Sequence, residues 1–297
     1  MLALDPPLGA SGAADAATIG GVVASGDSGP LRHRYGAARD LVVGMTMALA
    51  DGTVAKSGGK VIKNVAGYDL AKLLAGSFGT LGVILRVAVR LHPLRPRVTL
   101  RLEAGDPGRL GELATTLSHS HLEMEALDAR WAAGSGTVLA RFAGSACGDQ
   151  AQAATQLAGG GTLVEGDDEE RLWAEQRKLQ RPESGIVIRV SGRQAGLARV
   201  AAEAESAAAT MVTRAALGIS WLALEEADDE AAVATIRELR ERLAPSPCVV
   251  LDAPDGVRGA LDVWDEDDPG RLALTARVKE RFDPQRLMRP GVFVGGI

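Results

Sequence analysis

The sequence is poor in cysteine. Only Cys147 and Cys248 occur among the 297 residues, and they form no CxxC pattern. Two distant thiols exclude a disulfide scaffold and favour a reducing compartment. A chain of this length buries roughly 75% of its unfolded surface, so its core needs no covalent staple.

Aromatic residues and excess positive charge are also scarce. The chain has four Trp, two Tyr and four Phe, and its formal net charge is -5. Recognition of nucleic acid uses a basic face and stacked aromatic rings. The composition therefore argues against a nucleic-acid partner.

Long hydrophobic runs are missing as well. No apolar stretch approaches the length of a transmembrane segment, and the N-terminus MLALDPPLGA lacks the basic region and apolar core of a signal peptide. We therefore expect a cytoplasmic protein. Residues 1–17 are turn-rich and predict an extended loop.

Motifs of metal or nucleophilic catalysis are absent. His119 and His121 form HxH at a predicted helix end, but no further Cys or His lies nearby. HExxH and GxSxG do not occur, and no Cys–His pairing has a recognisable spacing. We predict no metal site, and spacing alone assigns no catalytic residue.

Glycine, in contrast, is concentrated in the stretch Lys60–Pro93. Gly76, Gly79 and Gly82 recur every third residue between a predicted helix, Asn64–Ala75, and a predicted strand, Val83–His92. The near-continuous apolar character of that strand predicts burial on both faces. Glycines at such a turn bring backbone amides close to a ligand.

A second glycine-rich segment lies earlier. Thr18 is a predicted N-cap for a helix over Ile19–Ser25, in which Gly20 and Gly21 serve either a packing contact or the close approach of a ligand. The residues alone favour packing.

A hairpin follows this helix. Asp40–Ala50 and Thr53–Lys56 are predicted strands joined by a type I′ turn at Asp51-Gly52. Arg39 and Asp40 form either a surface pair or a small-molecule contact.

In the middle of the chain, predicted strands and predicted helices alternate regularly. This pattern predicts a second domain of two βαββαβ halves. We expect the halves to join into one antiparallel sheet with helices on one face. The predicted strands are Val98–Glu103, Glu123–Ala129, Thr137–Phe142, Thr162–Glu165, Ile186–Ser191, Met211–Arg214, Gly218–Leu224 and Cys248–Asp252. The predicted helices are Pro107–Ser118, Asp149–Ala158, a connecting Asp168–Gln180, Gln194–Ala208 and Asp228–Leu243. Gly159–Gly161 predicts a helix C-cap rather than a phosphate loop.

The remaining residues predict a polar loop over 253–270, a helix over Arg271–Phe282 and an irregular tail. We therefore expect three segments. These are a first domain at 1–96, a second domain at 97–252 and a C-terminal segment at 253–297 that returns to the first domain.

Several of these pieces carry a family resemblance. ATIGGVVASGDSG, RYGAARDLVVGMTMALADGTV and GGKVIKNVAGYDLAKLLAGSFGTLGVI resemble, in order and spacing, the FAD-binding domain of the vanillyl-alcohol oxidase / p-cresol methylhydroxylase (PCMH) type. The glycine turn looks most like that of E subunits of bacterial glycolate oxidase. The tail KERFDPQRLMRPGVF is similar to the family's closing FDP…NPG motif.

The resemblance implies an α+β fold, with a partial PCMH-type FAD-binding domain at 1–96 and a ferredoxin-like α/β cap domain with an antiparallel sheet at 97–252. It implies FAD as cofactor and contacts to it from twelve residues. Those assigned to the flavin and pyrophosphate are Thr18, Gly20, Gly21 and Ser25. Those assigned to the adenosine and ring parts are Gly29, Tyr35, Gly36, Asp40, Gly79, Thr80, Gly82 and Val83.

The sequence also departs from the family. We expect no counterpart here of the family's N-terminal FAD subdomain. Arg289 and Val292 stand where Asn and a basic residue are usual, and the histidine-rich substrate motif of catalytic relatives is missing.

The resemblance further implies a subunit that acts beside a catalytic flavin subunit and an iron–sulfur subunit. Together they would oxidise glycolate, a 2-hydroxy acid, to glyoxylate. A non-catalytic scaffold with a degenerate flavin fold and an autonomous FAD-dependent 2-hydroxy-acid oxidoreductase remain alternatives.

Overall fold

The computed structural model describes residues 1–7, 17–59, 69–225 and 228–297. The chain divides into two compact units. The first consists of Met1–Pro6, Gly12–Pro93 and Glu266–Ile297, and the second of Pro7–Ser11 and Leu94–Asp265. Among the described residues, no helix is long and apolar enough to cross a bilayer. The roles predicted for the segments 1–96, 97–252 and 253–297 stay a prediction.

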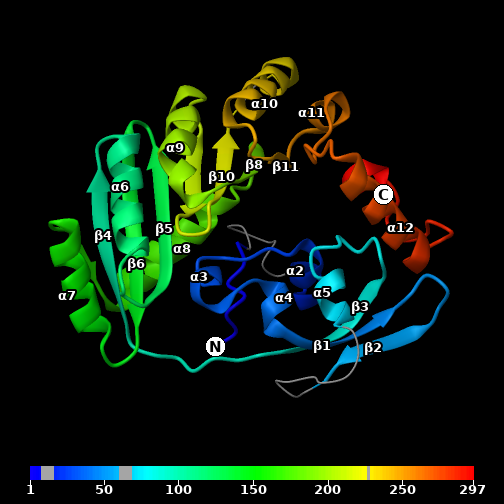
Figure 1. The fold of residues 1–297 in the computed structure, drawn as a ribbon, viewed down its shortest axis with the longest axis horizontal. Coiled ribbons are helices and arrows are strands. Elements are labelled where there is room, and N and C mark those ends of the chain that lie inside the picture. Colours follow the sequence, from blue (N-terminus) through cyan, green and yellow to red (C-terminus); the bar gives the residue numbers. More distant parts are fainter. Residues whose placement is uncertain (8–16, 60–68, 226–227) are drawn as a thin grey trace. The chain divides into compact units, whose positions relative to one another are not determined.

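The first unit is built on a three-stranded antiparallel sheet in the order β2-β1-β3 (Figure 1). Its strands are β1 (Val42–Ala48), β2 (Val54–Gly58) and β3 (Val83–Val89). Its helices are α2 (Ile19–Ser25), α3 (Arg32–Tyr35), α4 (Ala38–Leu41), α5 (Leu70–Leu74), α12 (Pro269–Phe282) and the short η2 (Val294–Gly296). Leu41, Met47 and Leu74 are fully buried in its core.

Three local predictions for this unit are wrong. Asp40 lies in α4 rather than in a strand, and β1 begins at Val42. The hairpin closes through a three-residue loop, in which Leu49 N donates to Thr53 O and only Gly52 has a positive φ (83°), so the turn is not type I′. Strand β3 is not buried on both faces, because Val83 and Leu85 are each more than half exposed.

Two further predictions include residues that the structure does not describe. Of the helix predicted over Asn64–Ala75, the described part forms α5 only over Leu70–Leu74, and residues 64–68 lie outside the described residues. The predicted extended loop over 1–17 likewise includes residues 8–16, which lie outside them.

The second unit is an eight-stranded, wholly antiparallel sheet in the order β11-β8-β10-β9-β5-β6-β4-β7. Its strands are β4 (Arg97–Ala104), β5 (Met124–Ala132), β6 (Ser135–Ala143), β7 (Thr162–Val164), β8 (Ile186–Ser191), β9 (Thr210–Arg214), β10 (Ile219–Leu224) and β11 (Cys248–Asp252). The two predicted halves join through β5 and β9, where Asp128 lies opposite Arg214. The prediction of one antiparallel sheet is confirmed.

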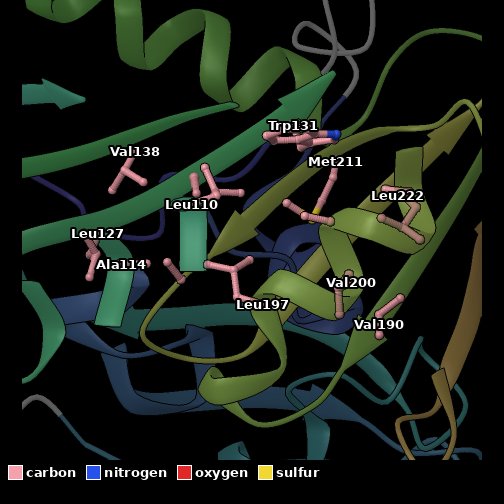
Figure 2. Close-up of a cluster of buried hydrophobic side chains, with 14 of the residues drawn as sticks. Leu110, Ala114, Leu127, Trp131, Val138, Val190, Leu197, Val200, Met211 and Leu222 are labelled. Carbon is pink, nitrogen blue, oxygen red and sulfur yellow. The ribbon is translucent and has the colours of Figure 1, made fainter. Parts of the chain in front are cut away.

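Four helices cover one face of this sheet: α6 (Pro107–Ser118), α7 (Cys147–Ala158), α9 (Leu197–Ser206) and α10 (Asp229–Leu243). Their apolar sides meet the strands in one core, in which Leu110, Leu127, Trp131 and Met211 are buried (Figure 2). Gly159 caps α7 with a φ of 78°, as predicted. A 3-10 turn, η1 (Gln194–Gly196), precedes α9.

Helix α8 (Gly166–Gln180) covers the opposite face, so the prediction of helices on one face is wrong. Trp173 packs there against Ala126 and Leu139 and donates a hydrogen bond of 2.8 Å to Thr99 Oγ1. The predicted loop over 253–270 contains a further helix, α11 (Asp255–Ala260), and the first two residues of α12.

Candidate functional site

Helix α2 forms as predicted. Thr18 is extended at φ −106°, and its Oγ1 accepts a hydrogen bond of 3.0 Å from Gly21 N. Gly26, in the left-handed region, ends the helix after Ser25. The Ser25 hydroxyl turns back to Val22 O at 3.2 Å. This segment is therefore a rigid, capped turn of helix.

The glycine turn lies directly beside this helix. Gly76 N donates to Val23 O at 2.9 Å, and Phe78 N donates to Ala24 O at 2.8 Å. A Cβ on Gly26 would lie 3.2 Å from Gly76 Cα. The two glycine-rich segments, about 50 residues apart in the sequence, thus form one continuous backbone surface.

Three glycines of this surface have no packing partner that excludes a side chain. A Cβ on Gly20 would make only ordinary contact with Ile84 at 3.6 Å, one on Gly79 would meet Arg289 Cδ at 3.4 Å, and one on Gly76 would meet nothing within 4 Å. Gly76 and Gly79 also need glycine for their φ angles of 80° and 76°. The space beside Gly76 is therefore open, and a Cβ is tolerated at Gly20 and Gly79, which fits the close approach of a cofactor to the backbone.

Other predicted contact glycines have a structural explanation instead. A Cβ on Gly29 would lie 1.7 Å from Asp5 O, and one on Gly36 would lie 2.7 Å from a carboxylate oxygen of Asp40. Asp40 Oδ2 accepts from Ala37 N at 2.9 Å and so caps α4. These residues hold the α3–α4 segment together, whether or not they also meet a ligand.

Tyr35 and Arg32 belong to the same segment. The Tyr35 ring lies 4.3 Å from the His92 ring, centroid to centroid. Arg32 Nη1 donates to Ser28 Oγ at 3.1 Å. Burial lowers the pKa of Arg32 from its usual value, against the opposing effect of the Asp40 carboxylate.

The remaining predicted residues lie at the end of the glycine turn. Thr80 is buried, and its hydroxyl donates to Ser77 O at 2.7 Å, so this side chain points into the turn. A Cβ on Gly82 would lie 2.9 Å from Ala48 O, which explains that glycine by sheet packing. Val83 begins β3 with an exposed side chain.

Sequence reasoning missed the residues of the C-terminal segment that hold the glycine turn in place. Lys279 Nζ, on α12, donates to Thr80 O at 2.8 Å, to Met288 O at 2.7 Å and to Asp283 Oδ2 at 2.6 Å. Both ionic side chains are buried. Although burial opposes ionisation of Asp283, hydrogen bonds from Lys279 and from the amides of Met288 and Leu287 lower its pKa. A Lys–Asp pair four residues apart at a helix end was the available signal.

One of the two tail residues that depart from the family motif contacts the same turn. Arg289 Nη1 donates to Phe78 O at 3.2 Å, and the Phe78 and Phe293 rings are 5.9 Å apart. Arg289 therefore has a role here in holding the backbone of the turn. The structure shows no comparable contact of Val292 among the described residues.

The chain is similar to known proteins in sequence and in fold. The model of the FAD binding domain family matches residues 7–58. The glycolate oxidase subunit GlcE of Escherichia coli (strain K12) is 43% identical over 102 residues, which is 34% of this chain and 28% of that protein. The D-lactate dehydrogenase of Archaeoglobus fulgidus is 45% identical over 80 residues, 27% of this chain and 18% of that enzyme.

A second glycolate oxidase subunit, GlcD of Bacillus subtilis (strain 168), is 45% identical over 76 residues, 26% of this chain and 16% of that protein. The chain thus covers less than a third of the length of each of these curated relatives.

Solved structures share the fold over nearly the whole chain. An alkyldihydroxyacetonephosphate synthase superposes with a TM-score of 0.65 at 12% identity, over 97% of this chain and 59% of that one. The BBE-like 1 protein of Physcomitrella patens gives a TM-score of 0.56 at 15% identity, over 91% of this chain and 68% of that one. The predicted α+β fold class is confirmed. FAD as the cofactor of the matched domain is confirmed too. Residues 7–58 of the chain thus resemble the FAD-binding domain of oxidoreductases, and the curated proteins similar to the chain include two glycolate oxidase subunits.

Proposed function

We propose that this chain is the FAD-binding subunit of a complex that oxidises glycolate to glyoxylate. The similarity to glycolate oxidase subunits supports this substrate class. The proposed partners are a catalytic flavin subunit and an iron–sulfur subunit, and the proposed location is the cytoplasm.

The reaction removes two electrons and two protons from the hydroxy acid. FAD, when bound, would supply an acceptor for two electrons and two protons. The proposed partner subunit would receive the electrons. The residues of this chain bind and orient the cofactor. We assign no proton transfer to a side chain of this chain.

One observation carries the proposal. Helix α2 and the turn Gly76–Gly82 lie side by side, joined by two main-chain hydrogen bonds. The space beside Gly76 is open, and a Cβ on Gly20 or Gly79 would make only ordinary contact with its neighbours. Gly20 lies within the segment that matches the FAD-binding family. No neighbouring atom excludes a Cβ at Gly20, so the presence of glycine there supports a bound group that lies against the backbone.

Gly20→Ala tests this directly, because the added methyl fits the folded protein. We expect FAD affinity of the full chain to fall about tenfold or more, since overpacking by one methyl costs about 1–3 kcal/mol. Flavin fluorescence during titration measures the affinity, and thermal unfolding checks the fold. Gly259→Ala, at a helical glycine with open space in α11, is the matched control and should leave FAD affinity unchanged.

Two outcomes would contradict the proposal. If the wild-type chain, alone and in its complex, binds no flavin, the scaffold alternative is correct. If Gly20→Ala binds FAD as tightly as wild type, α2 does not contact the cofactor. Turnover of a 2-hydroxy acid by the isolated chain with FAD would instead establish an autonomous oxidoreductase.

A further inference from the structure

The second unit contains a cavity of about 810 Å³. It is open to solvent and is lined by the loop after β8, the first turn of α9, the β9–β10 hairpin and the residues before β11. This volume is in the range of small-molecule sites. The residues proposed to contact FAD all belong to the first unit, so the cavity belongs to a different part of the fold.

The charged side chains that line this cavity are of one sign. Arg193 and Arg199 line it, and none of its described lining residues is acidic. Arg193 makes no ion pair within the described part of the chain. Arg199 Nη2 donates to Leu243 O at 3.2 Å, a neutral acceptor that fixes the guanidinium without neutralising it. Two uncompensated guanidinium groups favour an oxyanion, which they bind with charge-assisted hydrogen bonds.

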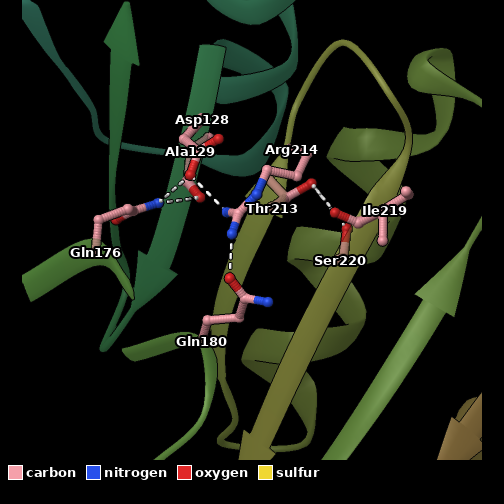
Figure 3. A network of polar contacts seen from close by, with 8 residues as sticks. All are labelled: Asp128, Ala129, Gln176, Gln180, Thr213, Arg214, Ile219 and Ser220. Atoms are coloured by element: carbon pink, nitrogen blue, oxygen red, sulfur yellow. Dashed lines mark hydrogen bonds and ion pairs between the residues drawn. The ribbon is translucent and has the colours of Figure 1, made fainter. Parts of the chain in front are cut away.

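The other polar lining is a pair of hydroxyl groups, on the buried side chains of Thr213 and Ser220. Ser220 Oγ donates to Thr213 Oγ1 at 2.9 Å, and Thr213 Oγ1 donates to Ile219 O at 3.1 Å (Figure 3). Both hydroxyl protons are therefore used inside the protein. Ser220 Oγ keeps acceptor capacity, so this part of the cavity favours a ligand that brings its own O–H donors.

The walls of the cavity are held by close backbone packing. Gly192 N donates to Gly218 O at 2.8 Å, and a Cβ on Gly218 would lie only 2.2 Å from Gly192 O. The loops that contain Gly192 and Gly218 therefore cannot move closer to each other. A side chain cannot be accommodated at Gly218. A site with walls fixed in this way is formed before a ligand arrives, which lowers the entropic cost of binding.

We propose that this cavity binds a small hydroxylated organic anion. Its phosphate or carboxylate contacts Arg193 and Arg199, and its hydroxyl groups donate to Ser220. The cavity is lined by no residue of α2 or of the glycine turn.

Isothermal titration calorimetry on the full chain at constant ionic strength tests the proposal. Ribose 5-phosphate and gluconate are the two anionic probes, which separate a phosphate from a carboxylate headgroup. Ribose and inorganic phosphate are the fragment controls. We expect saturable binding of one anionic probe at millimolar concentration or below, and weaker binding of both fragments.

Two variants test the residues. Arg193→Gln should weaken binding of that probe about tenfold or more, and Arg193→Lys should restore part of it. Arg171→Gln is the matched control, since Arg171 is an exposed arginine on α8, paired with Asp168. Ser220→Ala should weaken the binding of ribose 5-phosphate or gluconate but leave the binding of inorganic phosphate unchanged. Thermal unfolding of each variant confirms that it is folded.

Three results would overturn the proposal. The first is that neither anionic probe binds up to about 10 mM, a limit weaker than a millimolar site. The second is that a folded Arg193→Gln protein binds the anionic probe as tightly as the wild-type protein or the Arg171→Gln control does. The third is that inorganic phosphate binds as tightly as ribose 5-phosphate and gluconate does not bind, because the hydroxyl groups then contribute nothing.

Discussion

The ammonium group of Lys279 donates a hydrogen bond of 2.8 Å to the main-chain carbonyl of Thr80, 199 residues earlier in the chain. The same group is paired with Asp283 at 2.6 Å, and both side chains are buried. A buried cation is costly unless it is paired and hydrogen-bonded. The contact therefore fixes the glycine turn through the C-terminal helix.

Lys279→Met should loosen this turn. Breaking a buried pair leaves an uncompensated charge on Asp283 and costs about 3–5 kcal/mol. We expect the amides of Phe78 and Thr80 to exchange hydrogen at least about a hundredfold faster, as measured by mass spectrometry. Lys72→Met, at an exposed pair with Asp69, should have little effect. Unchanged exchange in Lys279→Met would show that the ion pair does not hold the turn.

The same pair predicts an acid sensitivity of the turn. The pKa of Asp283 is lower in the folded protein, so its contribution to stability is complete above its unfolded pKa of about 3.9. The contribution is lost as the pH falls through the lower folded value. Exchange at Thr80 should therefore rise below about pH 4 relative to the intrinsic rate. In Asp283→Asn this particular pH dependence should be absent, and its persistence would assign it to another group.

A buried network under α8 should stabilise the second unit. Arg214 Nη1 donates to Asp128 Oδ2 at 2.6 Å, Arg214 Nη2 donates to Gln180 Oε1, and Gln176 Nε2 donates to Asp128 Oδ2 at 3.2 Å (Figure 3). Arg214→Met should lower the free energy of unfolding by about 3–5 kcal/mol, because Asp128 stays buried and charged. Urea unfolding followed by tryptophan fluorescence measures it.

The double variant Asp128→Leu/Arg214→Met is the control for that experiment. Removing both charges should recover much of the loss, because the apolar pair leaves no unpaired ion. A double variant less stable than Arg214→Met would show that packing at these positions, rather than charge, dominates.

Cys248 should be unreactive in the folded protein. Burial, followed by the nearby Asp265 carboxylate, raises the pKa of this thiol to about 12, against the effect of Arg240. Since the thiolate is the nucleophile, iodoacetamide at pH 8 should leave Cys248 unmodified until the protein unfolds. Peptide mass spectrometry measures the modification. Alkylation of the native protein at the rate of a free cysteine would contradict the expected burial.

Much of the fold follows from local sequence. The helix Pro107–Ser118 and the strands Ile186–Ser191 and Cys248–Asp252 were predicted to the residue. Capping residues, prolines and the period of apolar positions act within a few residues, so the sequence displays them directly. The predicted Thr18 cap and the Gly159 C-cap are confirmed for the same reason.

Sequence-based errors cluster where burial depends on distant segments. The apolar run of β3 predicted a strand covered on both faces, yet Val83 and Leu85 are exposed. Helix α8 lies on the sheet face opposite the other helices, because Trp173 and Gln176 find partners on strands β4 and β5. The apolar or polar character of a residue indicates that its side chain needs burial or a hydrogen-bond partner. It does not indicate which segment of the chain covers or contacts that side chain.

The sequence by itself determined the elements, their order and the glycine positions at which a backbone is free to meet a ligand. The tertiary structure decided which of those glycines are open. It tolerates a Cβ at Gly20 and Gly79 but packs Gly29 against Asp5. It also brought Lys279 to Thr80 and Arg214 to Asp128. These contacts join residues 86 to 199 positions apart, and no local periodicity encodes them, because they depend on how the completed segments pack.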